Sequence, residues 1–560
     1  MITFDHVSVV YPESDEPMVQ DVNLEVAVGE WLVLAGPTGT GKSTLLNSIN
    51  GLVPRFTGGT LHGTVIVDGR DTSQLPPREL SDVVGVVNQD PLLGFVTDNV
   101  EAELAFGMEQ LGLSPSTMRQ RVEATIDLLG LADIRDRKLS QLSGGQQQRV
   151  AIGSVFTSHP KVLVLDEPTS ALDPTSAEEV LAALSRMVHD LGVTVVMAEH
   201  RLERVVQFAD RVALMSREGT VTSGSPAQMM KSSPVAPPVV TLGRAMEWDP
   251  LPLSVRDARR DATGLMRDLS RSQPDNSAPE RNPDPVLHAR KVVVAYDELV
   301  AVDQVDLDLY GGEIVAIMGR NGCGKSSLLW ALQGTGPMRS GKVELGGAKV
   351  RKSAGKRGLF RRKSQEPHGL DIGVGLVPQT PADLLFRDSV DKECEQADSD
   401  NGVPTGSTRA ILDQIAPGVP KATHPRDLSE GQKLSLALAI TLVAKPNVLL
   451  LDEPTRGLDY EAKARLSELL DQLRAEGIAV VLSTHDVEFV AQTCSRVIMM
   501  AGGEVIADDT AVEVLTALPA FAPQVSRILN DGKWLTVNQV VEAVGGSATV
   551  DGVETGDSHE

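Results

Sequence analysis

Short runs of apolar residues, many of them β-branched, recur along the chain and end at glycine or at charged residues. Examples are "WLVLA" at 31–35, "VLVLD" at 162–166 and "VTVVMA" at 193–198. Runs of this length that lead into glycine loops and helix starts predict buried strands of an α/β fold. No run approaches the roughly 18–20 apolar residues that cross a bilayer. We therefore expect no transmembrane segment.

The pattern occurs twice. The first copies are "GPTGTGKST" at 36–44, "VLVLDEPTSALD" at 162–173 and "AEH" at 198–200, and the second copies are "GRNGCGKSS" at 319–327, "VLLLDEPTRGLD" at 448–459 and "STH" at 483–485. The motifs keep their order, and the separation between copies stays nearly constant. The sequence therefore predicts a duplicated domain, and we call its copies half one and half two.

Each half is predicted to close with a small C-terminal subdomain. "PPVVTLGRAMEWDPLPLSVRDA" at 237–258 resembles "APQVSRILNDGKWLTVNQVVEA" at 522–543, which indicates a helix, a Trp-bearing turn and a second helix. The Pro-rich stretch at 270–286 reads as the linker between halves. The basic stretch at 349–369 occurs only in half two. It is either a solvated loop or a contact for anionic lipid or an acidic partner.

Length and composition describe a globular protein of several domains. The chain has 560 residues, which corresponds to roughly three or four folding units. Its formal net charge of −24 argues against general binding to nucleic-acid phosphates. The first residues contain neither a basic region nor an apolar core, so we expect no signal peptide. Three cysteines without metal-binding spacing fit a reducing cytoplasm.

A glycine-rich loop follows the strand predicted at 31–35 and leads into a helix. Backbone N–H groups of such a loop and the positive end of the helix hold phosphates. Lys42 would reach the β- and γ-phosphates of a nucleotide, and Ser43 would bind Mg²⁺. Lys325 and Ser326 repeat the arrangement in half two. Two matches, each after a hydrophobic strand, predict two nucleotide sites.

Pairs of carboxylates follow another predicted strand in each half. Asp166 can hold Mg²⁺ through water, and Glu167 is placed to act as the general base for the attacking water. Asp452 and Glu453 repeat the pair. Two acids after a strand could simply begin a loop, but the neighbouring phosphate loops favour catalysis.

Three further residue types recur at matched positions. The pairs are Gln89 and Gln379, His200 and His485, and Tyr11 and Tyr296. The glutamine amide could join the Mg²⁺ shell, and the histidine could orient the γ-phosphate and water. A lone histidine there would more often be structural. The tyrosines precede the phosphate loops in a chain with 3% aromatic residues, so they could stack on adenine.

Together with "LSGGQ" at 142–146 and "LSEGQ" at 428–432, these motifs resemble the ATPase subunits of ABC transporters. The resemblance implies an α/β fold of two tandem P-loop NTPase domains of ABC-ATPase type, each with a helical signature subdomain and a small C-terminal subdomain. In that family two ATPase domains pack head to tail, and each ATP lies between the phosphate loop of one and the signature of the other. One chain could then form both composite sites.

The motifs and the resemblance give these domain boundaries and site residues. We expect ATPase domains at 1–230 and 287–516, C-terminal subdomains at 231–269 and 517–545, a linker at 270–286 and a disordered tail at 546–560. The catalytic residues would be Glu167, His200, Glu453 and His485, and the Mg²⁺ ligands Ser43, Gln89, Asp166, Ser326, Gln379 and Asp452. ATP would be bound by Tyr11, Gly36, Pro37, Thr38, Gly39, Thr40, Gly41, Lys42, Ser43, Thr44, Gln89, Ser143, Gly144, Gly145, Gln146, Tyr296, Gly319, Arg320, Asn321, Gly322, Cys323, Gly324, Lys325, Ser326, Ser327, Gln379, Ser429, Gly431 and Gln432.

Three stretches look like the ATPases of energy-coupling-factor importers, which take up vitamins and metal ions. They are 49–72, 98–114 and 198–212, and the paired C-terminal subdomains agree. This resemblance implies a membrane T-type subunit and a substrate-binding S subunit as partners, at the cytoplasmic face of the cell membrane. Acidic residues near the glutamines could meet basic coupling helices; they are Asp90, Glu101, Glu103, Asp383, Asp388 and Asp391.

Two other functions remain open. A twin ATPase of a sugar or peptide importer would share every motif above. A ribosome-associated twin-ATPase translation factor would also have two halves, but those proteins join them by a long, charged helical linker. The connector at 270–286 is short, Pro-rich and not strongly basic, which disfavours the second alternative.

The two signatures differ at one position. Ser143-x-x-Gln146 and Ser429-x-x-Gln432 both have the spacing of a capping box, so each is predicted to begin a helix. Glu430 replaces a glycine in half two. An acid in a first helical turn stabilises the helix by about 0.3–1 kcal/mol, but it would repel a nearby γ-phosphate. We expect two working ATP sites of unequal activity.

Overall fold

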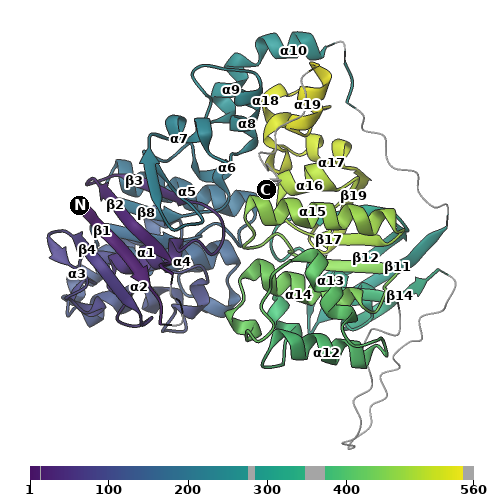
Figure 1. The fold of residues 1–560 in the computed structure, drawn as a ribbon, viewed down its shortest axis with the longest axis horizontal. Coiled ribbons are helices and arrows are strands. Elements are labelled where there is room, and N and C mark those ends of the chain that lie inside the picture. The colour runs from purple at the N-terminus through teal and green to yellow at the C-terminus, as the bar shows by residue number, and fades with distance from the viewer. Residues whose placement is uncertain (13, 15, 271, 275–283, 347–372, 546–560) are drawn as a thin grey trace, which may run out of the picture. The chain divides into compact units, whose positions relative to one another are not determined.

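The computed structural model describes residues 1–12, 14, 16–270, 272–274, 284–346 and 373–545 (Figure 1). Most of the predicted linker, the basic stretch at 349–369 and the tail from 546 lie outside these residues. Contacts divide the chain into two compact units. Unit one contains 1–273 with Arg527–Asn530 and the chain from Val537, and unit two contains 274–526 with Asp531–Thr536.

Unit one begins with a small antiparallel sheet. In the described residues its strand order is β2-β1-β4-β5, with bounds β1 (Ile2–Val10), β2 (Val19–Val26), β4 (Thr60–Val67) and β5 (Arg70–Asp71). Val22, Leu24 and Val26 are buried along β2, while the residues between them are exposed. One face of this sheet therefore packs into a hydrophobic core, as the alternation of apolar and polar residues requires.

The second sheet of unit one is mainly parallel. Its described order is β10-β9-β3-β8-β7-β6, with β3 (Trp31–Ala35), β6 (Val84–Val87), β7 (Val162–Asp166), β8 (Thr194–Ala198), β9 (Arg211–Met215) and β10 (Val221–Gly224). The strands predicted at 31–35 and 162–166 are confirmed, and every residue of β3 and β8 is buried. Because parallel strands end at the same edge, Asp166 lies opposite Ala198 there. The residues that follow these strands therefore meet at one edge.

The helices of half one either pack on these sheets or pack on one another in separate groups. They are α1 (Lys42–Ile49), α2 (Val100–Gln110), α3 (Pro115–Leu129), α4 (Gly144–Phe156), α5 (Pro174–His189), α6 (Leu202–Val205), α7 (Pro226–Ser232), α8 (Pro238–Ala245), α9 (Val255–Asp261) and α10 (Thr263–Leu269). α2 and α3 both pack on α4, which begins at the first signature. This group is the helical subdomain that the family resemblance implied.

Unit two repeats the architecture. Its described sheets have the orders β12-β11-β14 and β15-β16-β17-β13-β18-β19. The strands are β11 (Pro285–Tyr296), β12 (Leu299–Tyr310), β13 (Ile314–Met318), β14 (Met338–Leu345), β15 (Val374–Val377), β16 (Val448–Asp452), β17 (Ala479–Ser483), β18 (Arg496–Ala501) and β19 (Glu504–Thr510). The helices of half two are α11 (Lys325–Gln333), α12 (Val390–Asp400), α13 (Ser407–Ile415), α14 (Glu430–Leu442), α15 (Tyr460–Ala475), α16 (Val487–Thr493), α17 (Ala511–Ala517), α18 (Gln524–Leu529) and α19 (Val537–Ala543).

Unusual backbone conformations recur at matched positions of the two halves. Glu167 and Glu453 both have positive φ, at 46° and 50°, and His6 and Lys291 have φ of 50° and 47°. Non-glycine residues rarely adopt this conformation. Its recurrence at the same places is independent support for the duplication that the motifs predict.

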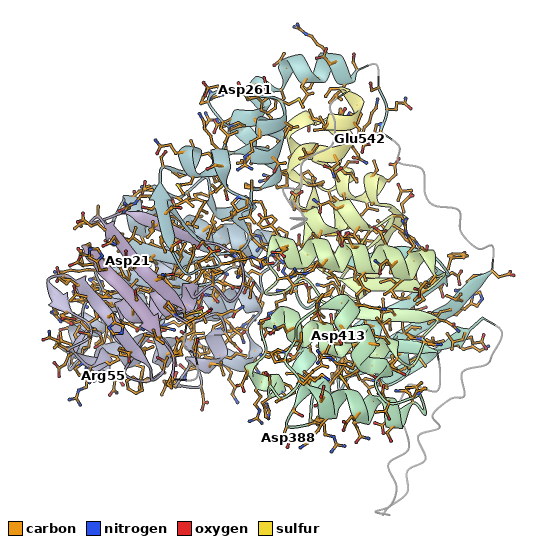
Figure 2. All side chains as sticks on the ribbon, in the orientation of Figure 1. Asp21, Arg55, Asp261, Asp388, Asp413 and Glu542 are labelled. Atoms are coloured by element: carbon orange, nitrogen blue, oxygen red, sulfur yellow. The ribbon has the colours of Figure 1, made fainter. Side chains whose placement is uncertain are left out.

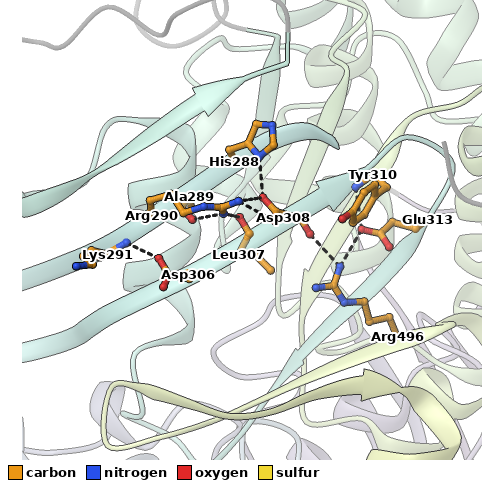
Figure 3. Close-up of polar contacts among 10 residues, drawn as sticks. All are labelled: His288, Ala289, Arg290, Lys291, Asp306, Leu307, Asp308, Tyr310, Glu313 and Arg496. Atoms are coloured by element: carbon orange, nitrogen blue, oxygen red, sulfur yellow. Dashed lines mark hydrogen bonds and ion pairs between the residues drawn. The ribbon is translucent and has the colours of Figure 1, made fainter. Parts of the chain in front are cut away.

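A buried arginine connects the two sheets of unit two. In unit two, Arg496 lies 3.2 Å from Glu313 Oε1 and donates to the carbonyl oxygen of Asp308 at 2.9 Å (Figure 3). The Asp308 carboxylate in turn pairs with His288 and Arg290, each at 2.7 Å. Arg496 begins β18 of the core sheet, while Asp308 belongs to β12, so the bond from Arg496 to Asp308 holds the antiparallel sheet against the core sheet.

The predicted C-terminal pattern of helix, Trp-bearing turn and helix is confirmed in both halves. Trp248 lies between α8 and α9, and Trp534 lies between α18 and α19. Within unit one, α19 packs on α8, and Arg259 Nε donates to the carbonyl oxygen of Arg527 at 2.7 Å. The last helix of half two thus belongs to the same compact unit as the C-terminal helices of half one. No helix in the described part of the chain has the length and apolarity to span a membrane.

Candidate functional site

The first phosphate loop is folded around its own lysine. Lys42 Nζ donates to the carbonyl oxygens of Gly36 at 2.9 Å and Pro37 at 2.6 Å. Gly41 precedes α1 with φ of 97°, where a Cβ atom would lie 2.8 Å from the carbonyl oxygen of Met18. No side chain caps α1, so the N–H groups of its first turn can bind a phosphate.

The second phosphate loop has the same geometry. Lys325 Nζ donates to the carbonyl oxygens of Gly319 at 2.9 Å and Arg320 at 3.3 Å. Gly324 precedes α11 with φ of 104°, and α11 likewise has no side-chain cap. The structure thus places both predicted loops at uncapped helix starts next to a central strand.

The predicted tyrosines lie in different surroundings. The Tyr11 hydroxyl is 2.9 Å from Thr44 Oγ1, which places the ring beside the first phosphate loop. Tyr296 is 46% exposed at the end of β11. Stacking of either ring on adenine stays a prediction.

Three residues from distant segments meet at the end of β7. The carboxylate of Glu167 lies 2.8 Å from His200 Nε2 through Oε1, and it accepts a hydrogen bond from Gln89 Nε2 at 3.0 Å through Oε2. Both oxygens of the predicted general base are therefore held by residues that the sequence placed in the same site. The positive φ of Glu167 turns its side chain out of the strand.

The electrostatics of this cluster keep Glu167 ionised. Burial would raise the pKa of Glu167, but the hydrogen bond and charge of His200, with the charge of Lys42, lower that pKa below its ordinary value. The pKa of Asp166 is raised, mainly by burial, although a hydrogen bond from Ser43 opposes the shift. A base that stays ionised next to a second carboxyl is suited to accept a proton from water.

Half two brings the equivalent residues together with different contacts. His485 lies 2.9 Å from Glu453 Oε2 through Nδ1 rather than Nε2. Ser483 donates to the Asp452 carboxylate and accepts from the Glu453 N–H at 3.2 Å. Gln379 is exposed, whereas Gln89 is half-buried. The described residues show no bond between Gln379 and Glu453 that matches the one between Gln89 and Glu167.

The proposed Mg²⁺ ligands have suitable chemistry in both halves. The Ser43 hydroxyl lies near the Asp166 carboxyl and the Ser326 hydroxyl near the Asp452 carboxyl, and each hydroxyl acts to lower the pKa of its neighbour. A hydroxyl beside a carboxylate fits Mg²⁺, which takes oxygen ligands and is completed by phosphate and water oxygens. Burial raises the pKa of Asp452, with the bonds from Ser483 and Ser326 opposing it. These pairs could hold Mg²⁺ next to each phosphate loop.

Both signatures begin helices with complete capping boxes, as predicted. Ser143 Oγ accepts from the Gln146 N–H at 3.4 Å, and Gln146 Oε1 accepts from the Ser143 N–H at 3.0 Å. Ser429 and Gln432 repeat these bonds at 3.3 and 3.0 Å. Because the serine oxygen is an acceptor in the box, its O–H proton is still available to a phosphate. In half two, Glu430 is paired with Lys433 at 2.9 Å.

Sequence reasoning missed the side chain that precedes His200. Glu199 is buried and bonds Thr169, His200 and Arg201, while Thr484 stands at the equivalent position of half two. The signal was present in the sequence, because the copies "AEH" and "STH" differ there.

The structure corrects one expectation about the acidic residues near Gln89. Glu103 is buried and accepts from the N–H groups of Val96 and Thr97 at 3.1 and 2.8 Å. It holds the loop that follows Gln89, so its predicted contact with a basic partner helix is wrong. In half two, Asp388 is exposed on the helical part of unit two and pairs with Lys392 at 2.8 Å (Figure 2).

The fold and the two phosphate loops define a tandem P-loop ATPase. The family model described as ABC transporter matches residues 19–170 and 302–456. A Streptomyces avermitilis protein, provisionally named an ABC transporter ATP-binding protein, is 55% identical over 97% of this chain and 100% of its own length. A Methanosarcina mazei protein with the same name is 32% identical over 92% and 90%. This chain belongs to the ABC transporter family, as an ATPase that binds ATP and couples its hydrolysis to transport.

A solved structure shows the same tandem fold. The archaeal ribosome recycling factor aABCE1, in a complex with the ribosomal stalk protein aP1, matches 92% of this chain and 92% of its own with a TM-score of 0.58. The two sequences are 19% identical. At this identity the likeness concerns the fold alone.

Proposed function

We propose that this ATPase energises a membrane importer of the energy-coupling-factor type, with a vitamin or a metal ion as cargo. Its partners would be a membrane T-type subunit and a substrate-binding S subunit, at the cytoplasmic face of the cell membrane. Support for this subfamily comes from the helix, Trp-bearing turn and helix that close both halves.

The proposal of a membrane partner rests on a group of exposed apolar side chains that follow the active-site glutamines in sequence. Leu93 and Val96 follow Gln89 and are 83% and 63% exposed, and Phe386 follows Gln379 and is 82% exposed. Large apolar side chains with this exposure are typical of binding sites for another protein. They are close enough in sequence to the glutamines to link a membrane partner to the ATP site.

The chemistry proposed for half one follows from its contacts. Lys42 would exchange the carbonyl oxygens of its own loop for the β- and γ-phosphates of ATP. Glu167 would accept a proton from the attacking water, while His200 orients the carboxylate and the γ-phosphate. When bound to Ser43, Asp166 and Gln89, Mg²⁺ would supply positive charge to the phosphates.

Half two would use the matching residues. Lys325 would bind the phosphates, Glu453 would act as the base, and His485 would orient it. Mg²⁺ would be held there by Ser326, Asp452 and Gln379. The pairing of each signature with the phosphate loop of the other half stays a prediction from the family resemblance.

Detergent purification of the tagged full chain from membranes of its host tests this function. Recovery of a T-type membrane protein with a small S-type subunit is the expected result. A permease pair with a periplasmic binding protein would instead establish a sugar or peptide importer, and ribosomes would establish the translation-factor alternative.

A matched pair of variants tests the apolar surface. Changing both Leu93 and Val96 to Asp should abolish recovery of the membrane partner. Leu191→Asp is the control, because Leu191 is also exposed, at 55%, but lies after α5 and away from Gln89 in sequence. Equal recovery with both variants would show that this surface is not the docking site.

A further inference from the structure

A buried carboxylate lies between the two turns that carry the catalytic residues of half one. Glu199 is 1% exposed. Its Oε2 accepts a hydrogen bond from Thr169 Oγ1 at 2.6 Å, and its Oε1 accepts from the N–H groups of His200 at 3.0 Å and Arg201 at 3.2 Å. One side chain therefore connects the turn after Glu167 to the turn that contains His200.

A cationic side chain reinforces the same turn. Arg204 Nη1 donates to the carbonyl oxygen of Thr169 at 2.8 Å and to that of Leu172 at 3.3 Å. Burial, followed by the negative charge of Glu167, raises the pKa of Glu199, and the bonds from Thr169 and Arg201 oppose the shift. A carboxyl group buried at this cost is stable only where several donors satisfy it, and this site supplies three.

Half two has a smaller side chain with fewer hydrogen bonds at the same position. Thr484 replaces Glu199, and its Oγ1 lies 3.1 Å from Thr455 Oγ1 and accepts from the Asp486 N–H at 3.1 Å. A single hydroxyl oxygen thus takes the place of two carboxylate oxygens. The two copies hold their catalytic histidines by different means.

We propose that Glu199 is a positioning residue for His200 in the ATPase reaction of half one. Its two oxygens fix the His200 backbone relative to the Thr169 turn, so that Nε2 stays 2.8 Å from Glu167 Oε1. The inference rests on the proposed roles of Glu167 and His200. It assigns a function to a residue that does not itself touch the reacting atoms.

The test compares full-length variants at position 199. Vanadate with a photoreactive ATP analogue traps nucleotide at a site that has hydrolysed it, and proteolysis then shows which half carries the label. Glu199→Ala should lower trapping in half one by about tenfold or more, because a catalytic group misplaced by ~1 Å can cost about 100-fold. The KM for ATP should change less than about twofold, since the phosphate loop is untouched.

A conservative variant separates positioning from bulk structure. Glu199→Gln should retain trapping in half one, because the amide oxygen can still accept both N–H groups and the amide nitrogen can donate to Thr169. Glu199→Thr introduces the residue found in half two, and its trapping in half one should lie between those of the parent chain and Glu199→Ala. This variant replaces Glu199→Ala in the test if the alanine variant does not fold. Leu191→Ala, at an exposed position after α5, is the control that should leave trapping in half one unchanged.

Three outcomes separate the failure of this inference from the failure of the proposed function. If His200→Ala lowers trapping in half one but folded Glu199→Ala does not, Glu199 has no positioning role. If Glu199→Gln lowers trapping in half one as much as Glu199→Ala does, the hydrogen bonds of residue 199 are not what supports trapping, and the inference is overturned. If His200→Ala itself retains full trapping, the proposed role of His200 is wrong, and the inference falls with it.

Discussion

His200 Nε2 lies 2.8 Å from Oε1 of Glu167, and both side chains are almost completely buried. In half two the same residue types meet at 2.9 Å through Nδ1 of His485. A histidine this close to a carboxylate favours the ionised form of the acid. In half one burial would raise the pKa of Glu167, but the hydrogen bond and charge of His200 outweigh burial, so the pKa lies below its ordinary value.

The first prediction concerns the pH dependence of turnover in half one. His200→Ala removes the hydrogen bond and the charge that lower the pKa of Glu167, so that pKa should rise. A base with a higher pKa becomes protonated earlier as the pH falls. The acid limb of the rate profile, measured as vanadate trapping in half one, should therefore move to higher pH.

The matched control for this pH experiment is His200→Gln, which keeps a hydrogen-bond donor without the titratable charge. It should move the acid limb less than His200→Ala does. An unchanged limb in both variants would contradict the role assigned to His200. Glu167 also contributes stability above its unfolded-state pKa, and this contribution is lost as the pH falls through the lowered folded-state pKa.

The second prediction concerns the two general bases. Glu167→Gln and Glu453→Gln together should reduce ATP turnover by about 10²–10⁴-fold, which is the usual contribution of a positioned base. Binding of ATP should persist, since Lys42 and Lys325 are unchanged. Turnover is measured by phosphate release and binding by equilibrium dialysis. Full ATPase activity in the double variant would contradict the assignment of Glu167 and Glu453 as general bases.

Local patterns explain what the sequence predicted well. The strand at 31–35 and the helix start at Ser429 depend on residues within a few positions of one another, so short-range hydrophobicity and capping chemistry suffice. The meeting of Gln89 with Glu167 joins residues 78 positions apart. The bond itself was not predicted; that both residues belong to one ATP site was predicted, because each lies in a motif of the family.

Pairing of buried charges could not be predicted in the same way. Glu103 looked available to a partner, but the loop between Gln89 and α2 folds back and places its N–H groups on that carboxylate. Glu199 was treated only as part of a repeated motif. For Glu103 the donors include two backbone N–H groups, whose positions depend on tertiary structure and leave no mark in residue identity. For Glu199 the difference between "AEH" and "STH" marked the position, but not the donors that it would meet.

The third prediction concerns stability and uses the ion pair of Figure 3. Glu313 is 1% exposed and pairs with Arg496, whose pKa is raised because the partners Asp508 and Glu313 outweigh burial. Glu313→Ala would leave Arg496 with fewer acceptors. Breaking a buried pair costs about 3–5 kcal/mol. Since Asp508 still pairs with Arg496, we expect the free energy of unfolding to fall by an amount near the lower end of this range.

The control for this stability prediction is the exposed pair of Asp388 and Lys392. Asp388→Ala should cost less than about 1 kcal/mol, as surface pairs do. Urea unfolding followed by circular dichroism measures both variants against the parent chain. Equal losses for Glu313→Ala and Asp388→Ala would show that burial does not govern the strength of the first pair.

The fourth prediction concerns the acid in the second signature. Glu430 lies in the first turn of α14 and pairs with Lys433 at 2.9 Å, so its charge is partly neutralised within its own helix. Glu430→Gly removes this pair and the favourable interaction of an acid with the helix N-terminus. We expect the free energy of unfolding of the variant to be lower by about 1 kcal/mol, since glycine also has a low helix propensity.

Binding of ATP should respond in the opposite direction. If the second signature serves the nucleotide on Lys42, as the family resemblance implies, Glu430→Gly should leave the affinity of that site unchanged or raise it. Lys433→Ala should lower the affinity, because the Glu430 carboxylate then loses its neutralising partner. Titration of a fluorescent ATP analogue into a Lys325→Ala background measures the Lys42 site alone. A clear loss of affinity in Glu430→Gly would contradict repulsion and would show that Glu430 supports the site through its helix.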